Sequence, residues 1–209
     1  MRNNHITRLV TLALMVALTI LLGVTPLGYL PPIFGVQITI MCLPVIIATI
    51  ALGLRGGLAI GLAFAATSLY QALTAPTGLL APLVAYPAAM YPSIFIPRLL
   101  IPVVTYLIYK ATRKLPNGWR FGISAAAGSF SNTIFFLLFV YVLGANQLAA
   151  FFGMTKQAVL AALAVLIPTN GLMEMAAAVI ICVPVLFALK AAMPHLFRET
   201  KQDFATKEK

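Results

Sequence analysis

The 209-residue chain has very few acidic side chains, with 4 Asp and Glu against 14 Lys and Arg, and charged residues make up only 9% of it. Apolar residues make up 62%, and the mean hydropathy of +1.02 is far above that of soluble globular domains. The formal net charge of +10 would suggest a nucleic-acid partner in a soluble chain, but here the cations lie between and after long apolar runs. The composition therefore indicates an integral membrane protein and argues against nucleic-acid binding.

Other scarce residues exclude several classes of chemistry. The two cysteines, Cys42 and Cys182, both lie in apolar runs, so neither a disulfide framework nor metal-ligand spacing is indicated. The two histidines, His5 and His195, lie near the expected cytoplasmic ends, too far from the serines at 129 and 131 for a Ser–His hydrolase. The chain also has no G-x-x-x-x-G-K-[S/T] motif for nucleotide hydrolysis. We therefore expect no enzyme activity, no metal and no cofactor.

The apolar runs predict an all-α membrane protein with six spans. They cover residues 6–25, 36–54, 58–73, 95–114, 120–143 and 169–192. The run 155–193 would be about 58 Å long as one helix, too long for one crossing, so a break at Pro168 is expected to leave a short extra helix at 155–167. Residues 1–197 then form one transmembrane domain, and 198–209 a flexible, charged cytoplasmic tail.

The distribution of cations predicts the orientation. With the N-terminus inside and six crossings, all of the 14 Lys and Arg except Arg98 and Lys156 lie on the cytoplasmic side. An excess of cations in cytoplasmic loops is typical of membrane proteins. The sequence therefore predicts that both termini are cytoplasmic.

Four polar residues are expected at one depth, in the outer half of the membrane. Arg98 lies about 18 Å along its span from Lys110, Asn132 about 18 Å from Arg120, and Glu174 about 24 Å from Lys190. Asn170 is one helical turn from Glu174, on the same face. Ionisable residues within a membrane face the bundle interior or a cavity, so a polar cavity open to the outside is predicted.

Simpler interpretations of these residues stay open. Arg98 and Glu174 could form a structural ion pair, or Arg98 could extend toward the headgroups. Asn132 and Asn170 could join helices through hydrogen bonds. The Pro168 break would leave the amides of Gly171, Leu172 and Met173 free at a helix N-terminus, which would favour an anionic or strongly polar ligand that Arg98 could hold in a bidentate manner.

Two uncharged, proline-rich connections are candidates for covering the cavity. Residues 25–37 include Gln37, and residues 74–93 include Tyr86 and Tyr91. Aromatic and amide side chains in such loops could contact a ligand in the cavity. The tyrosines could equally be interfacial anchors at the headgroup level.

Span one contains Ala13 and Ala17 in an A-x-x-x-A pattern, whose small side chains allow close approach of another helix. Four further motifs follow it along the chain: Q-I-T-I-M-C-L-P-V-I-I at 37–47, Pro97-Arg98, Ser131-Asn132-Thr133, and N-G-L-M-E at 170–174. Together, in this order and on six spans, they resemble the S components of energy-coupling factor (ECF) vitamin transporters. The resemblance covers roughly residues 9–189.

The resemblance implies a membrane-embedded vitamin binder that associates with a transmembrane coupling protein and two cytosolic ATPases, and that topples in the bilayer to deliver its substrate. It maps the docking face for the coupling protein onto Ala13 and Ala17. It also implies an outward pocket built from spans four to six and capped by the loops after spans one and three. The substrate-binding candidates are Arg98, Asn132, Asn170, Glu174, Gln37, Tyr86 and Tyr91.

The motifs at 37–47 and 131–133 look most like those of pantothenate-type S components, although Cys42-Leu43 and Ser131 depart from that pattern. A cation with amide side chains suits pantothenate, a small anion with hydroxyl and amide groups. Glu174 alone would better suit a cationic pyridoxamine or an aminopyrimidine, and folate and cobalamin are further alternatives. A solitary secondary transporter and a structural subunit of a membrane complex are the competing classes.

Overall fold

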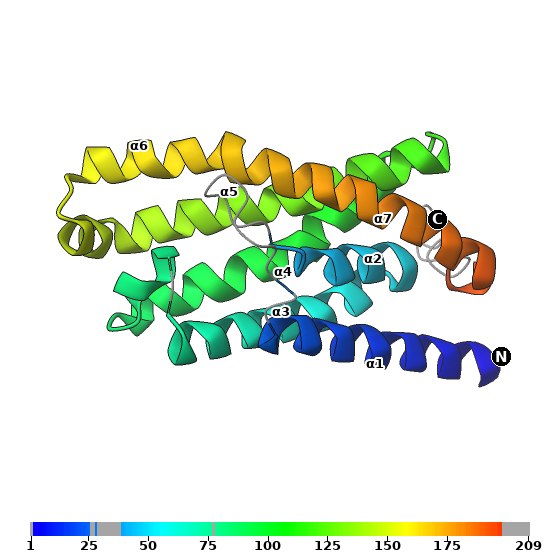
Figure 1. Cartoon of the computed structure of the whole chain (residues 1–209). Coiled ribbons are helices and arrows are strands. Elements are labelled where there is room, and N and C mark those ends of the chain that lie inside the picture. Colours follow the sequence, from blue (N-terminus) through cyan, green and yellow to red (C-terminus); the bar gives the residue numbers. More distant parts are fainter. Residues whose placement is uncertain (1, 26–27, 29–38, 77, 198–209) are drawn as a thin grey trace, which may run out of the picture.

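The computed structural model describes residues 2–25, 28, 39–76 and 78–197, with side chains from residue 6 onward, and this part of the chain is all-helical, as predicted. The helices are α1 (Arg2–Val24), α2 (Cys42–Leu52), α3 (Leu54–Thr74), the 3-10 helix η2 (Gly78–Leu83), α4 (Pro87–Ala111), α5 (Asn117–Phe152), α6 (Lys156–Leu166), the π-helix η3 (Ile167–Gly171) and α7 (Leu172–Ala192). They form one elongated bundle (Figure 1). The predicted tail at 198–209 lies outside the described residues.

Five of the helical stretches are long and apolar enough to cross a membrane: Ile6–Val24, Leu54–Thr74, Pro87–Ala111, Asn117–Phe152 and Lys156–Ala192. The second predicted span differs, because α2 has only 11 residues and is therefore about 16 Å long, against about 30 Å for a hydrocarbon core. Every residue of α2 is buried, and Figure 1 shows this helix within one half of the bundle's length. Residues 36–38 of that span lie outside the described part, so the count of six crossings stays a prediction.

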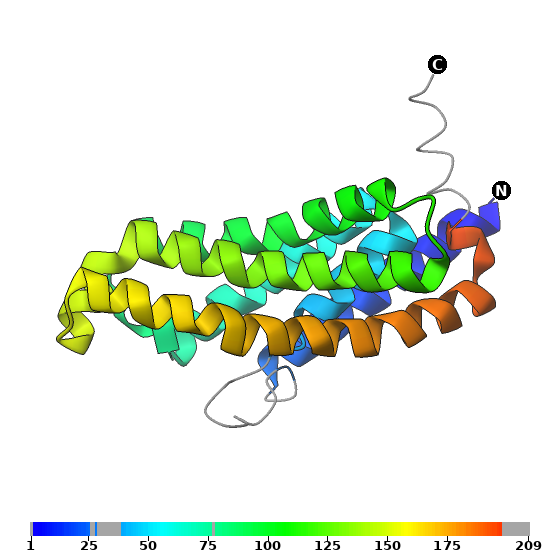
Figure 2. The ribbon, with the colours of Figure 1, turned by 90° about the horizontal axis from the view of Figure 1, so that it is seen from above.

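The beginning of α1 and the end of α7 lie at the same end of the bundle (Figures 1 and 2). The turn between α4 and α5, which carries Arg113 and Lys114, lies at that end too. This arrangement agrees with an even number of crossings and with basic residues gathered on one side. Which side of the membrane this end faces stays a prediction.

The expected open connection at 74–93 is wrong, because η2 occupies 78–83 and α4 begins at Pro87. Proline is tolerated in the first turn of a helix, since the N–H groups there have no partner within the helix. Pro92, Pro97 and Pro102 lie inside α4 without ending it. Neighbouring groups in a membrane bundle can satisfy the carbonyls that such prolines leave free, and α4 shows this at Ser93, as described below.

α5 has 36 residues and extends to Phe152, beyond the predicted end at 143. It ends at Gly153, whose φ of 63° favours glycine. At about 54 Å, α5 is much longer than a hydrocarbon core. The residues at this distal end are apolar and exposed, with Phe151 61%, Phe152 43% and Met154 48% exposed.

The predicted break at Pro168 is also wrong. α6, η3 and α7 follow one another without interruption, so residues 156–192 form one continuous helical stretch. A π-helical segment accommodates the proline, and Gly171 has ordinary helical angles of φ −62° and ψ −41°. Gly171, Leu172 and Met173 are therefore not at a free helix N-terminus, and the anion-binding argument built on their amides does not apply.

Candidate functional site

The prolines of α4 position Arg98. Pro97 has no N–H, so it cannot bond the carbonyl of Ser93 one turn earlier. The Arg98 side chain takes this carbonyl, with Nη1 donating to Ser93 O at 3.2 Å. Pro102 leaves the carbonyl of Arg98 free in the same way, and α3 approaches it so closely that a Cβ added at Gly61 would lie 2.9 Å from that oxygen. The prolines of α4 thus free one carbonyl that the Arg98 side chain binds and leave the carbonyl of Arg98 itself facing α3.

Two aromatic rings from neighbouring helices enclose the Arg98 guanidinium. Its Cζ lies 5.3 Å from the ring centroid of Phe64 on α3 and 4.8 Å from that of Phe136 on α5. Such contacts are electrostatically attractive and gain in strength where water is excluded. Because Arg98 is only 8% exposed, its side chain lies in the bundle interior. The alternative in which it extends to the headgroups is therefore wrong.

Glu174 on α7 is held by two threonines. Its Oε1 accepts hydrogen bonds from the backbone N–H of Thr39 at 3.1 Å and from the Thr39 hydroxyl at 2.7 Å. Its Oε2 accepts from the Thr133 hydroxyl of α5 at 3.0 Å. The carboxylate, 4% exposed, thus joins α5, α7 and the segment that leads into α2.

One stretch of α5 brings the two charges together. Phe136 contacts Arg98, and Thr133, one turn earlier, binds Glu174. Arg98 and Glu174 are close enough for their charges to attract each other. α5 also packs tightly against the end of η3 here, since a Cβ added at Gly171 would lie 3.3 Å from Thr133 Cγ2.

The two asparagines lie next to these groups along the helices. Asn132 precedes Thr133 and is 7% exposed, while Asn170 is one turn from Glu174. Within the described residues, the side-chain oxygen of each asparagine is buried without a hydrogen-bond partner. Buried polar atoms in native proteins nearly always have a partner, so these two oxygens are places where a ligand could donate hydrogen bonds.

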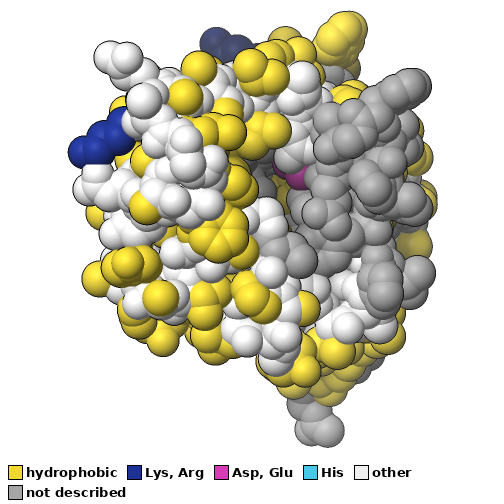
Figure 3. Space-filling model, turned by 60° about the vertical axis from the view of Figure 1, so that its left-hand side comes forward, with side chains coloured by type: hydrophobic (Ala, Val, Ile, Leu, Met, Phe, Trp, Pro, Cys, Tyr) yellow, Lys and Arg dark blue, Asp and Glu magenta, His cyan; other side chains and the backbone are white. Residues whose placement is uncertain are grey.

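The end of the bundle opposite the N-terminus is hollowed. Figure 3 shows this face, on which an acidic side chain is visible in a hollow and basic side chains are few. Glu174 is the only Asp or Glu in the part of the chain that the structure describes. Only 4% of Glu174 is exposed, so its carboxylate is almost fully covered.

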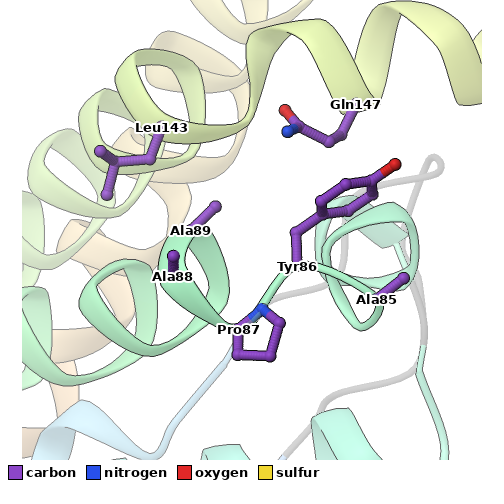
Figure 4. Close-up of a pocket in the computed structure, with 7 residues that line it drawn as sticks. All are labelled: Ala85, Tyr86, Pro87, Ala88, Ala89, Leu143 and Gln147. Carbon is purple, nitrogen blue, oxygen red and sulfur yellow. The ribbon is translucent and has the colours of Figure 1, made fainter.

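The loop candidates are not gathered around Arg98. Gln37 lies outside the described residues. Tyr86, 49% exposed, lines a separate pocket of about 370 Å³ where α4 begins, and its ring lies below the Gln147 side chain of α5 (Figure 4). Tyr86 is about 18 Å along the chain of α4 from Arg98. Tyr91, 45% exposed, is two turns from Arg98.

Four residues from other segments contact the Arg98 or Glu174 side chain and were not among the sequence candidates: Thr39, Phe64, Thr133 and Phe136. Thr39 and Thr133 do lie in the quoted motifs at 37–47 and 131–133. Phe136 is one turn after Asn132, which could have indicated a shared face. Phe64 has no such signal in the sequence.

The A-x-x-x-A pattern of α1 lies on an outer surface. Ala13 and Ala17 are both exposed, and only 17% of the apolar stretch of α1, within Ile6–Val24, is buried. The buried side of α1 is marked instead by Thr11 and Thr19, which are 7% and 0% exposed. The small residues are thus exposed and accessible to another helix.

The geometry can be compared with known proteins. No curated protein matches the chain at a significant level. The family model described as "ECF transporter, substrate-specific component" matches residues 7–186, which include most of α1, the arginine of α4 and the carboxylate of α7. Since this match covers most of the chain, the protein belongs to the family of substrate-specific components of ECF transporters.

Proposed function

We propose that this multi-pass plasma-membrane protein binds pantothenate and delivers it to an ATP-driven ECF transporter. The family is one of transporter subunits rather than enzymes, and membership implies partnership with the components of an ECF module. The proposal adds the identity of the vitamin, the site, and a module made of a transmembrane coupling protein and two cytosolic ATPases. We also propose that both termini lie on the cytoplasmic side.

One combination of buried groups carries the choice of substrate. The Arg98 guanidinium lies against Phe136, and the oxygens of Asn132 and Asn170 lack partners among the described residues and lie one helical turn from Phe136 and from Glu174. Arg98 offers a positive charge with fixed donors, which suits the carboxylate of pantothenate. The oxygens of Asn132 and Asn170 accept hydrogen bonds, which suits its hydroxyl groups. A small polar anion therefore matches this set of groups.

Glu174 weighs against a cationic vitamin. Its two oxygens already accept three hydrogen bonds, from Thr39 and Thr133. A pyridoxamine or aminopyrimidine would have to replace these donors in order to pair with the carboxylate, which loses bonds worth about 1.5–3 kcal/mol each when the acceptor is charged. We therefore assign Glu174 to holding the segment before α2 at the edge of the site, and Arg98 with the two asparagines to the substrate.

Calorimetric titration of the purified protein tests the proposal. Pantothenate should bind tightly, and pyridoxamine, an aminopyrimidine, folate and cobalamin should not. Arg98→Gln should lower the affinity for pantothenate by about tenfold to a hundredfold, because a charge-assisted hydrogen bond is lost. Lys156→Gln is the matched control, since Lys156 is exposed at the start of α6 and its loss should leave the affinity unchanged.

Two results would contradict the substrate. One is tight binding of another vitamin without binding of pantothenate. The other is wild-type affinity in the Arg98→Gln variant. Uptake by proteoliposomes that hold this protein alone, driven by an ion gradient, would favour a solitary secondary transporter instead.

A further inference from the structure

A second concave site lies on the membrane-facing surface between α5 and α7, which run side by side (Figure 2). It has a volume of about 660 Å³. Its α5 wall carries Gly118, Gly122 and Ala126, spaced four residues apart on one face. The remaining lining residues are apolar: Trp119, Ile123, Val179, Ile180, Val183 and Pro184. We name this feature the α5–α7 groove.

The groove exists because α5 lacks side chains where α7 passes. A Cβ added at Gly122 would meet Val179 and Val183 at 3.8 Å, and one at Gly118 would meet Phe187 at 3.8 Å. These are ordinary contact distances, so a methyl group at either glycine would touch α7 without a clash. Trp119 and Ile180, 70% and 72% exposed, stand at its edges.

An open apolar groove at this position is surrounded by hydrocarbon, since both helices are membrane spans. A lipid acyl chain fills such a surface by dispersion contacts, which are the main source of packing energy inside a bilayer. From Gly118 to Ala126 the groove runs about 12 Å along α5, less than the roughly 15 Å of one leaflet. Its length thus suits the upper part of one acyl chain in one leaflet.

The basic residues near the groove favour a lipid with an anionic headgroup. α5 begins at Asn117, directly after the turn that contains Arg113 and Lys114, and both of these side chains are exposed. Trp119 lies next to this turn, as expected at the level of the headgroups. In the described part of the chain the nearest acid along α7 is Glu174, which faces Thr39 and Thr133 rather than this end. The mouth of the groove is therefore positively charged.

We propose that the α5–α7 groove binds an anionic phospholipid, with one acyl chain between α5 and α7 and the phosphate next to Arg113 and Lys114. Cationic pockets between membrane helices are typical sites for acidic headgroups. This site is separate from the vitamin site, because its α5 residues end at Ala126, about 10 Å along the helix from Thr133, and lie near the basic end of the bundle. An anionic lipid would then stay bound to the protein.

Native mass spectrometry with lipid titration tests the proposal. The purified protein is mixed with phosphatidylglycerol or phosphatidylcholine that carry the same acyl chains. We expect roughly thirtyfold tighter binding of phosphatidylglycerol, because two cations at the surface attract its charged headgroup. Gly122→Leu should abolish this binding by filling the groove, and Gly122→Ala is the matched control, since its Cβ fits at 3.8 Å and leaves most of the space.

A second variant tests the contribution of the headgroup apart from that of the acyl chain, and it does not depend on the packing around Gly122. Arg113→Gln with Lys114→Gln should remove the preference for phosphatidylglycerol and leave equal, weak binding of both lipids. Equal binding of both lipids to the wild type would overturn the proposal, as would full binding in a folded Gly122→Leu variant. Loss of the bound lipid on forming a dimer or on assembly with the coupling protein would also overturn it, because the groove would then be a protein interface.

Discussion

Replacing Thr133 with Val should destabilise the protein by about 1–2 kcal/mol. The Thr133 hydroxyl donates to Glu174 Oε2 at 3.0 Å, and among the described residues no other group donates to that oxygen. Hydrogen bonds to charged groups contribute about 1.5–3 kcal/mol in soluble proteins, whereas those between membrane helices average about 0.6 with a maximum near 1.7 kcal/mol. A buried, charged acceptor places this bond at the upper end of the membrane range.

Valine is the right replacement because it keeps the shape of threonine. The methyl group that packs near Gly171 is retained, so the change removes the donor and little else. Thr39→Val serves as an internal comparison. It removes one of two donors to Oε1 and leaves the backbone N–H of Thr39 at 3.1 Å, so it should cost less than Thr133→Val.

Thermal unfolding in detergent measures the effect. About 1–2 kcal/mol corresponds to a fall in Tm of roughly 3–6 °C for a chain of this size. Thr133→Ser keeps the hydroxyl and should stay near the wild type. In a double-mutant cycle with Glu174→Gln, the Thr133→Val change should cost about 1 kcal/mol less than it does alone. A Thr133→Val variant as stable as the wild type, or additive effects in the cycle, would refute the role given to this bond.

Two further predictions follow from the packing. Gly61→Ala should lower the free energy of unfolding by about 1–3 kcal/mol and weaken vitamin binding, because its Cβ would lie 2.9 Å from the carbonyl oxygen of Arg98. Gly122→Ala is the control and should change the Tm little, because its Cβ would lie 3.8 Å from its neighbours. Equal Tm values for the two variants would contradict the reasoning. Ala17→Trp should abolish uptake by the assembled transporter but leave vitamin affinity in calorimetry unchanged, because Ala17 is exposed on α1. Leu62→Trp on the exposed side of α3 is its control, and loss of uptake in both variants would count against a specific docking face.

The fold class and most of the crossings could be predicted from the lengths of the apolar runs. Two of the errors, the connection at 74–93 and the break at 168, involve proline. Taken locally, Pro92 and Pro168 indicate loops or breaks, because each removes a hydrogen bond from the helix. In the bundle, α4 continues past its three internal prolines and the arginine side chain takes one freed carbonyl, while a π-helical segment absorbs Pro168. A rule based on one segment cannot anticipate compensation supplied by neighbouring groups.

The sequence indicated the similar depth of Arg98 and Glu174 but not the groups that contact them. Counting helical rise from the basic ends placed Arg98 and Glu174 at neighbouring levels, and their charges do interact. The groups that hold them come from distant segments, however, such as Thr39, which is 135 residues from Glu174 in the chain. No periodicity connects such positions. That Asn132 and Asn170 contact the vitamin stays a prediction.

The length of the distal helices has a consequence for how the protein sits in its bilayer. α5 and the continuous stretch 156–192 are each about 25 Å longer than the hydrocarbon core, and the far end of α5 carries the exposed Phe151 and Phe152. Standing upright, the bundle would lift these phenylalanines into water. A tilted bundle would keep them at the membrane interface, so the tilt angle should depend on the thickness of the bilayer through hydrophobic mismatch. A thinner bilayer should make it lean further, and a thicker one should let it rise.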